Sequence, residues 1–121
     1  MMQNFLLFST LVLLAGTTQA EWRLVWQDEF NGNHVDLSQW GFEVGGNGWG
    51  NNELEFYTYN RTENARIENG NLVIDVHVED YRERQFTSAR MHTKQAWKYG
   101  RFEIRARMPN GHSKFSIIAF F

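Results

Sequence analysis

The sequence predicts an all-β domain, an antiparallel sandwich or barrel, and three observations lead to this fold class. After residue 20, no segment shows the apolar period of a helix of useful length. Gly, Asn and Asp gather in short clusters, such as NGN at 31–33 and GGNG at 45–48, which are typical of turns. The segments between the clusters are short and rich in aromatic and β-branched residues, as strands are. No internal repeat or linker interrupts the pattern, which indicates a single domain.

The first twenty residues are predicted to be a secretory signal peptide that precedes this domain. Phe5–Gly16 is apolar, no charged side chain occurs before Glu21, and small residues stand at Thr18 and Ala20. The first four residues lack the Lys or Arg that usually opens such a peptide. A membrane anchor is the alternative, but the apolar stretch is too short to span a bilayer comfortably. We therefore expect cleavage after Ala20 and a secreted mature chain over residues 21–121, with no membrane association.

The expected strands are apolar or alternating segments bounded by turn signals. A hairpin is the strongest of these predictions, because Asn69-Gly70 is a typical two-residue turn between two such segments. The last two expected strands differ: Gly100–Met108 alternates between apolar and charged residues, whereas Phe115–Phe121 is almost continuously apolar. In chain order, the expected strands are Arg23–Trp26, Leu54–Tyr59, Ala65–Glu68, Asn71–Val78, Ala89–Thr93, Gly100–Met108 and Phe115–Phe121.

Charge and cysteine content restrict the class of protein. The chain has 121 residues, 12 Lys and Arg against 14 Asp and Glu, and a formal net charge of -2. Such a balance gives no basic surface that would attract nucleic acid, so we exclude nucleic-acid binding. The absence of Cys means that a secreted domain here must depend on its hydrophobic core rather than on disulfides. About 100 residues support only a modest core, which suggests that the domain is part of a larger one.

Aromatic and amide side chains are concentrated in one stretch, GWGNNELEFYTYN, at residues 48–60. Aromatic rings stack on the apolar faces of sugars, while Asn, Glu and Arg hydrogen-bond to the hydroxyls. A neutral polysaccharide would suit such a surface. The alternative is that the aromatic residues fill the core of the sandwich, as large apolar residues mostly do. Trp49 is the exception that we favour for binding, because it lies between two glycines in a loop.

Two neighbouring carboxylates are the candidates for catalysis in this sequence. Glu53 and Glu55 are two apart on an expected strand, so their side chains would share a face, as the two carboxylates of a glycosidase must. Alternating glutamates more often mark a solvated face, and we favour that interpretation. The four His residues lack metal-ligand spacing. Asn60-Arg61-Thr62 is an acceptor triplet for N-glycosylation, which a secreted protein could use.

Six blocks of the sequence, taken together and in this order, resemble glycoside hydrolase family 16. They are LVWQDEFNG, VDLSQW, GWGNNELEFYT, ARIENGNLVIDV, FTSARMHTK and YGRFEIRARMPNG, and they extend from Leu24 to Gly111. The branch that they resemble comprises laminarinase-like endo-β-1,3-glucanases and the β-glucan recognition proteins of invertebrates. The resemblance implies a concanavalin-like β-jelly-roll sandwich whose concave face binds glucan, and it agrees with the all-β fold class.

The resemblance also implies roles for individual residues. Trp49, Asn52 and Arg90 resemble residues that contact the sugar near the point of cleavage, and Asn51 and Glu53 resemble their neighbours at the rim. The implied ligand is a β-1,3-glucan or a mixed-linkage β-glucan, and no cofactor is required for the chemistry.

A structural calcium site is implied on the convex face of the complete domain. Glu29 and the backbone of Gly70 resemble part of this site. Oxygen donors of this kind suit calcium.

The sequence departs from the family after the turn at 109–111. The family has a Trp-Pro-Ala-x-Trp strand followed by Glu-x-Asp-x-x-Glu, but here Phe115–Ala119 takes the place of the first motif and the second is absent from the 121 residues. We therefore assign no catalytic residue and expect the N-terminal portion of a longer domain, inactive as it stands. Residues 21–111 do not distinguish a portion of a secreted β-glucan hydrolase from a non-catalytic β-1,3-glucan recognition protein.

Overall fold

The computed structural model describes residues 21–109 and residue 118, and in this part of the chain all regular elements are strands. The predicted signal peptide and the predicted strand Phe115–Phe121, except for Ile118, lie outside the described residues. A search of the described residues finds no helix that could span a membrane. The seven strands are β1 (Trp40–Glu43), β2 (Glu55–Tyr57), β3 (Ala65–Glu68), β4 (Asn71–Ile74), β5 (His77–Tyr81), β6 (Arg84–Ser88) and β7 (Arg90–Thr93).

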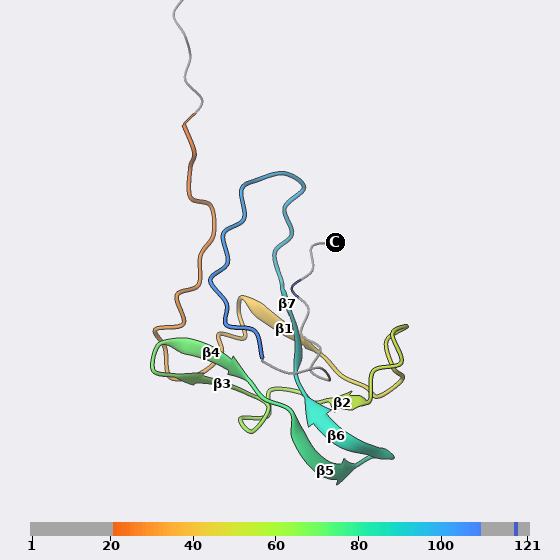
Figure 1. The fold of residues 1–121 in the computed structure, drawn as a ribbon. Helices are drawn as coiled ribbons and strands as arrows, with labels where there is room; N and C mark the ends of the chain where they lie inside the picture. Colours follow the sequence, from red (N-terminus) through yellow and green to blue (C-terminus); the bar gives the residue numbers. More distant parts are fainter. Residues whose placement is uncertain (1–20, 110–117, 119–121) are drawn as a thin grey trace, which may run out of the picture.

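The strands form three small sheets (Figure 1). Strand β1 pairs with β7 in antiparallel fashion, and β3 pairs with β4 in the same way. The third sheet has the order β2-β6-β5, in which β5 and β6 are antiparallel and β2 is parallel to β6. The chain passes from the β3–β4 hairpin directly into β5, and β6 then returns alongside it (Figure 1). The described residues thus confirm the all-β class, with one parallel pair that the sequence does not predict.

Turn chemistry predicts the first hairpin well and the second one not at all. Asn69 and Gly70 have φ values of 51° and 69°, as the short turn between β3 and β4 requires. The turn between β5 and β6 is formed by Arg82 and Glu83, which also have positive φ values, 43° and 66°. Residues with a Cβ atom rarely adopt this conformation, so the sequence carries no signal for a turn at these two positions.

Four of the predicted strand segments are confirmed in whole or in part, and two are wrong. The structure has strands within Leu54–Tyr59, Ala65–Glu68 and Ala89–Thr93, and it divides Asn71–Val78 between β4 and β5. Arg23–Trp26 and Gly100–Met108 are not strands, although the second alternates well. Alternation supplies a face to bury, but a strand also needs a neighbour for its backbone hydrogen bonds. The described part of the chain provides no such neighbour for either segment.

The segment before β1 and the segment after β7 run side by side (Figure 1) and are joined by aromatic contacts. The Trp26 ring lies 5.6 Å from that of Trp40 and 5.5 Å from that of Trp97, centroid to centroid. Asp28 fixes the cluster, because it accepts a hydrogen bond of 2.7 Å from Trp40 Nε1 and one of 2.8 Å from the backbone of Phe30. These contacts order two segments that have no strand pairing.

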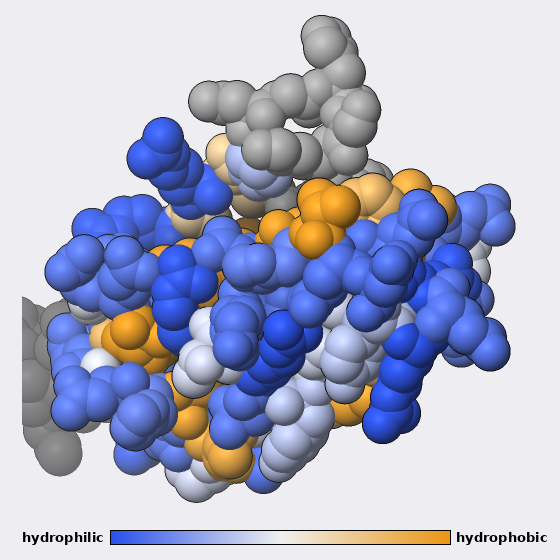
Figure 2. All heavy atoms as spheres, turned by 90° about the horizontal axis from the view of Figure 1, so that it is seen from below, coloured by the Kyte–Doolittle hydropathy of each residue, from blue (hydrophilic) through white to orange (hydrophobic). Residues whose placement is uncertain are grey.

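Few apolar side chains are buried among the described residues. The buried ones are Val35, Ala65 and Ala89, all of modest size. Large apolar side chains remain exposed, and Figure 2 shows some of them as orange patches between hydrophilic ones. Val78 on β5, for example, is 82% exposed. Hydrophobic burial therefore contributes less to this fold than is usual for a domain of its length.

A polar network takes the central place that apolar residues usually occupy. Asn64 and Thr87 are fully buried, at 0% exposure. The Asn64 side chain accepts a hydrogen bond of 2.8 Å from Thr58 Oγ1. Its amide donates to Thr87 Oγ1 at 3.0 Å and to the carbonyl of Asp75 at 3.3 Å. One side chain thus connects the end of β2, the loop after β4 and strand β6.

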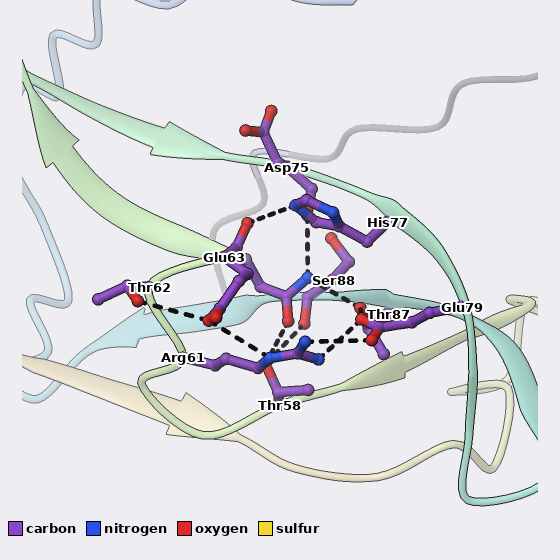
Figure 3. A network of polar contacts seen from close by, with 10 residues as sticks. Thr58, Arg61, Thr62, Glu63, Asp75, His77, Glu79, Thr87 and Ser88 are labelled. Carbon is purple, nitrogen blue, oxygen red and sulfur yellow. Dashed lines mark hydrogen bonds and ion pairs between the residues drawn. The ribbon is translucent and has the colours of Figure 1, made fainter.

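The network extends to a pair of charged groups at the surface (Figure 3). Arg61 donates two hydrogen bonds to the Glu79 carboxylate, of 2.7 and 3.1 Å, and Thr87 Oγ1 donates a third to the same group. Arg61 and then Thr87 hold the pKa of Glu79 below its ordinary value. His77 closes the other side with a contact of 2.7 Å between its Nε2 and the carbonyl of Glu63. The His77 side chain is exposed, on the outer side of β5.

Candidate functional site

The candidate site begins with a tightly wound loop between β1 and β2. Within residues 48–52 of this loop, four of the five residues have positive φ values: Gly48 at 80°, Trp49 at 45°, Gly50 at 78° and Asn52 at 57°. The backbone N–H groups of Asn51 and Glu53 both donate to the carbonyl of Gly48, at 2.9 and 3.2 Å. For Trp49 this conformation is strained, and such strain is concentrated at functional loops. The winding places the indole of Trp49 toward the sheet formed by β1 and β7.

Arg90 lies at the centre of the site. It begins β7 and stands directly opposite Glu43 of β1 in the register of the two strands. Its Nε donates a hydrogen bond of 2.6 Å to Glu43 Oε2. Its guanidinium carbon lies over the ring of Trp49, 4.7 Å from the centroid, and its Nη1 lies 4.0 Å from Glu53 Oε1. A cation is therefore held between two carboxylates and against one aromatic face.

Glu53 is the most enclosed charged group of the site, at 8% exposure. Asn51 Nδ2 donates to its Oε1 at 3.1 Å, and the Tyr57 hydroxyl donates to its Oε2 at 2.8 Å. Burial, and then this hydrogen bond to Glu53, raises the pKa of Tyr57, so the phenol stays protonated and remains a donor. Both oxygens of the buried carboxylate are thus satisfied, which a charge in this position requires.

The Trp49 side chain packs against its neighbours, but its indole N–H makes no hydrogen bond within the described residues. Its ring makes an edge contact with Tyr57 at 6.2 Å, and Gly45 gives it room, since a Cβ atom there would lie 3.9 Å from the indole. Its Nε1 is buried and has no hydrogen-bond partner among the described residues. A buried donor without a partner costs free energy, as does the positive φ of the same residue.

The structure brings together four of the five predicted binding residues, Trp49, Asn51, Glu53 and Arg90. The fifth, Asn52, is exposed in the same loop. Sequence analysis missed Glu43 and Tyr57, which complete the cluster. For Tyr57 a signal existed, because it follows Glu53 and Glu55 at alternate positions. For Glu43 there was none, because its partner Arg90 lies 47 residues away in the sequence.

Glu53 and Glu55 do not lie on one strand as their spacing suggested, and the favoured interpretation of a solvated face is wrong for Glu53, which is buried. Strand β2 begins only at Glu55, so Glu53 belongs to the preceding loop, and its two oxygens bond to Asn51 and Tyr57. These contacts describe a structural or binding carboxylate rather than a free catalytic one.

The predicted calcium residues, Glu29 and Gly70, are related only through Asn31, which lies beside both of them. Glu29 lines a hollow of about 320 Å³ together with Asp28 and Asn31. A Cβ atom placed on Gly70 would lie 4.0 Å from Asn31 Oδ1, so Gly70 is close to one of the residues that line this hollow. Calcium takes six to eight oxygen ligands, and the described residues contain no group of three His, Cys, Asp or Glu that could hold a metal. The calcium site stays a prediction.

Comparisons with known proteins place this chain in a family. No family profile matches the chain. Among curated proteins, a beta-glucanase of Rhodothermus marinus is 50% identical over 100 residues, and a glucan endo-1,3-beta-glucosidase of Cryptopygus antarcticus is 47% identical over 113 residues. Among solved structures, the laminarinase of Rhodothermus marinus superposes with a TM-score of 0.73 and 53% identity over 75% of this chain and 38% of its own. A second one, a non-specific endo-beta-1,3(4)-glucanase from family GH16, superposes with a TM-score of 0.61 and 36% identity over 68% of this chain and 36% of its own.

This chain belongs to glycoside hydrolase family 16. Its solved relatives are laminarinases of this family, so its strands are part of a β-jelly-roll, as the resemblance implied. The two curated relatives match over 80% and 89% of this chain, yet only over 35% and 42% of their own lengths. The chain therefore spans less than half of these family 16 relatives, and this coverage fits an N-terminal portion of the domain.

Proposed function

We propose that this chain is the glucan-binding, N-terminal portion of a secreted β-1,3-glucan hydrolase. The observation that carries the proposal is the cluster of Trp49, Arg90 and Glu53, in which an aromatic ring, a cation and a satisfied carboxylate lie together beside the β1–β7 sheet. Ring faces suit the apolar faces of glucose units, and the charged and amide groups suit their hydroxyls.

The relatives support the same ligand class. Their names describe glucanases. One solved relative was co-crystallised with 1,3-beta-D-cellotriosyl-glucose, and another was solved in complex with laminaritriose and laminaritetraose. The net charge of -2 also agrees with a neutral substrate, because no strong basic surface is available for an anionic one. These names favour a hydrolase as the parent over a recognition protein.

Binding is tested by titrating the chain with laminarihexaose, a linear β-1,3-linked glucose oligomer, in a calorimeter. We expect measurable binding that Trp49→Ala weakens by about fivefold, because an aromatic stacking contact is worth about 1 kcal/mol. Trp22→Ala is the matched control, since Trp22 is 72% exposed and outside the site. Equal affinities of the Trp49 and Trp22 variants would contradict the proposed site.

The same preparation is expected to release no reducing sugar from laminarin. A retaining glycosidase divides its work between two carboxylates, and the Glu-x-Asp-x-x-Glu motif that supplies them in the family is absent from the 121 residues. Sugar release that disappears in Glu53→Gln or Glu55→Gln would show that these two residues are replacement catalysts.

Secretion and glycosylation form part of the proposal. The apolar segment Phe5–Gly16 supports export, and Asn60 and Thr62 of the acceptor triplet are both exposed. Expressed in a eukaryotic host, the chain is expected in the medium with Glu21 as its first residue and a glycan on Asn60. Amino-terminal sequencing and mass spectrometry measure both features, and an intact Met1 in the medium would refute the cleavage.

A further inference from the structure

We infer that Glu43 is a positioning residue, which holds the guanidinium of Arg90 over the ring of Trp49 and thereby sets the affinity of the site for glucan. This inference rests on the proposed function for its ligand, but the contact between the two side chains stands independently of it. Glu43 ends β1, and nothing in the local sequence around it indicates a role in the site.

The first argument is the geometry of the pair. Glu43 and Arg90 are register partners in an antiparallel sheet, so their side chains stand on the same face. The bond between Arg90 Nε and Glu43 Oε2 is 2.6 Å long, whereas Arg90 Nη1 is 4.0 Å from Glu53 Oε1. Glu43 therefore makes the hydrogen bond, while Glu53 contributes attraction without one. Two carboxylates on different sides fix the plane of the guanidinium.

The second argument is that Glu43 is itself held in place. The next register pair on the same face of the two strands is Gly41 with His92, two residues along from Glu43 and Arg90. A Cβ atom on Gly41 would lie 2.5 Å from His92 Nε2, so the imidazole packs directly on the backbone of β1. His92 Nδ1 is 4.0 Å from Glu43 Oε1, the oxygen that does not bond to Arg90. The carboxylate thus lies between two side chains of β7.

A fixed Arg90 matters because a free arginine side chain has many rotamers, and ordering it when a ligand binds costs free energy. With Glu43 in place, the guanidinium already lies 4.7 Å above the Trp49 ring in the unbound chain. Without Glu43, the nearest carboxylate is Glu53, which would draw the guanidinium away from this position. Removal of Glu43 should then act on binding entirely through Arg90.

The test is a double-mutant cycle with Glu43→Ala, Arg90→Ala and the combination, measured as affinity for laminarihexaose. We expect Glu43→Ala to weaken binding by about tenfold in the wild-type chain and to have no further effect once Arg90 is alanine. Glu43→Gln keeps an acceptor for Arg90 Nε and should restore most of the loss. Glu68→Ala is the matched control, because Glu68 also pairs with an arginine, Arg66 at 2.9 Å, but on β3.

A second measurement separates this inference from the proposed function. The near-ultraviolet circular dichroism of Trp49 should change in Glu43→Ala, and the change should vanish when Trp49 is first replaced by Phe. If the wild-type chain binds no laminarihexaose, the proposed function fails, and the spectra alone decide the role of Glu43. Additive effects of the Glu43 and Arg90 substitutions, or unchanged spectra in Glu43→Ala, would overturn the inference.

Discussion

Replacing Asn64 with alanine is expected to lower the free energy of unfolding by about 3 kcal/mol or more, since each buried polar group that loses its partner costs about 1–3 kcal/mol. The substitution removes the closer acceptor of Thr58 Oγ1, which then has only the Ser88 carbonyl at 3.4 Å. It also removes the Asn64 amide that donates to Thr87 Oγ1 and to the Asp75 carbonyl. No water can replace the amide easily, because Asn64 is fully buried. Domains have net free energies of unfolding of only about 5–15 kcal/mol, so for a small chain this loss is a large part of the total stability.

The measurement is urea-induced unfolding followed by circular dichroism. Asn71→Ala serves as the control, because Asn71 is exposed and its amide bonds only to the nearby carbonyl of Asn69, at 2.9 Å. Its expected effect is about 0.5 kcal/mol or less. Asn64→Asp keeps the acceptor for Thr58 but removes both donors, so it should destabilise as well. An unfolding midpoint in Asn64→Ala equal to that of Asn71→Ala would show that the network does not support the fold.

Acid is expected to destabilise the chain through Glu79 in particular. Arg61, followed by Thr87, holds the pKa of Glu79 below its ordinary value of 4.5 in the folded chain. A group whose folded pKa is depressed stabilises the fold fully above its unfolded pKa. That contribution is lost as the pH falls below 4.5 toward the lower folded pKa. Stability should therefore fall as the pH decreases through this acidic range.

Glu79→Gln separates this contribution from general acid denaturation. The variant should be less stable than the wild type at neutral pH, and the two should converge as the pH falls through the acidic range, as measured by thermal unfolding at a series of pH values. Glu68→Gln is the control, because Glu68 is exposed and its ion pair with Arg66 is screened by solvent. A constant difference between wild type and Glu79→Gln at all pH values would refute the assignment.

How much of the fold could be predicted depends on the range of the interactions. The β3–β4 hairpin was predictable because Asn-Gly is the residue pair that most readily adopts the two positive φ values of a tight hairpin turn, as Asn69 and Gly70 do here. The β5–β6 hairpin was not, since Arg82 and Glu83 adopt left-handed conformations only because the surrounding strands enforce them. Strand β1 was missed for a similar reason: Trp40–Glu43 is stabilised by pairing with β7, about fifty residues later. Gly100–Met108 shows the opposite error, a convincing pattern without a strand to pair with.

In the candidate site too, residues close together in the sequence could be predicted, whereas contacts between distant strands could not. Trp49, Asn51 and Glu53 were selected from one compact stretch, because a wound loop of glycine and asparagine brings near neighbours in sequence together in space. Arg90 was reached only through the resemblance to the family, and Glu43 was not reached at all. Their contact exists only because β1 and β7 pair in one register, which no local pattern specifies.

The small number of buried apolar side chains has a consequence for how this chain responds to temperature. The heat capacity increment of unfolding comes mainly from apolar surface that becomes hydrated, about 0.45 cal/mol/K for each Å². Val35, Ala65 and Ala89 expose little new surface of this kind, while residues such as Val78 and Tyr99, at 82% and 83%, are hydrated already. The fully buried residues of the described chain therefore add little to the increment, and the free energy of unfolding should curve less with temperature than is usual for a domain of this length. Hydrogen bonds carry a large share of the stability beside the aromatic contacts of Trp26, so the weakening of the hydrophobic effect in the cold should destabilise this fold less than usual.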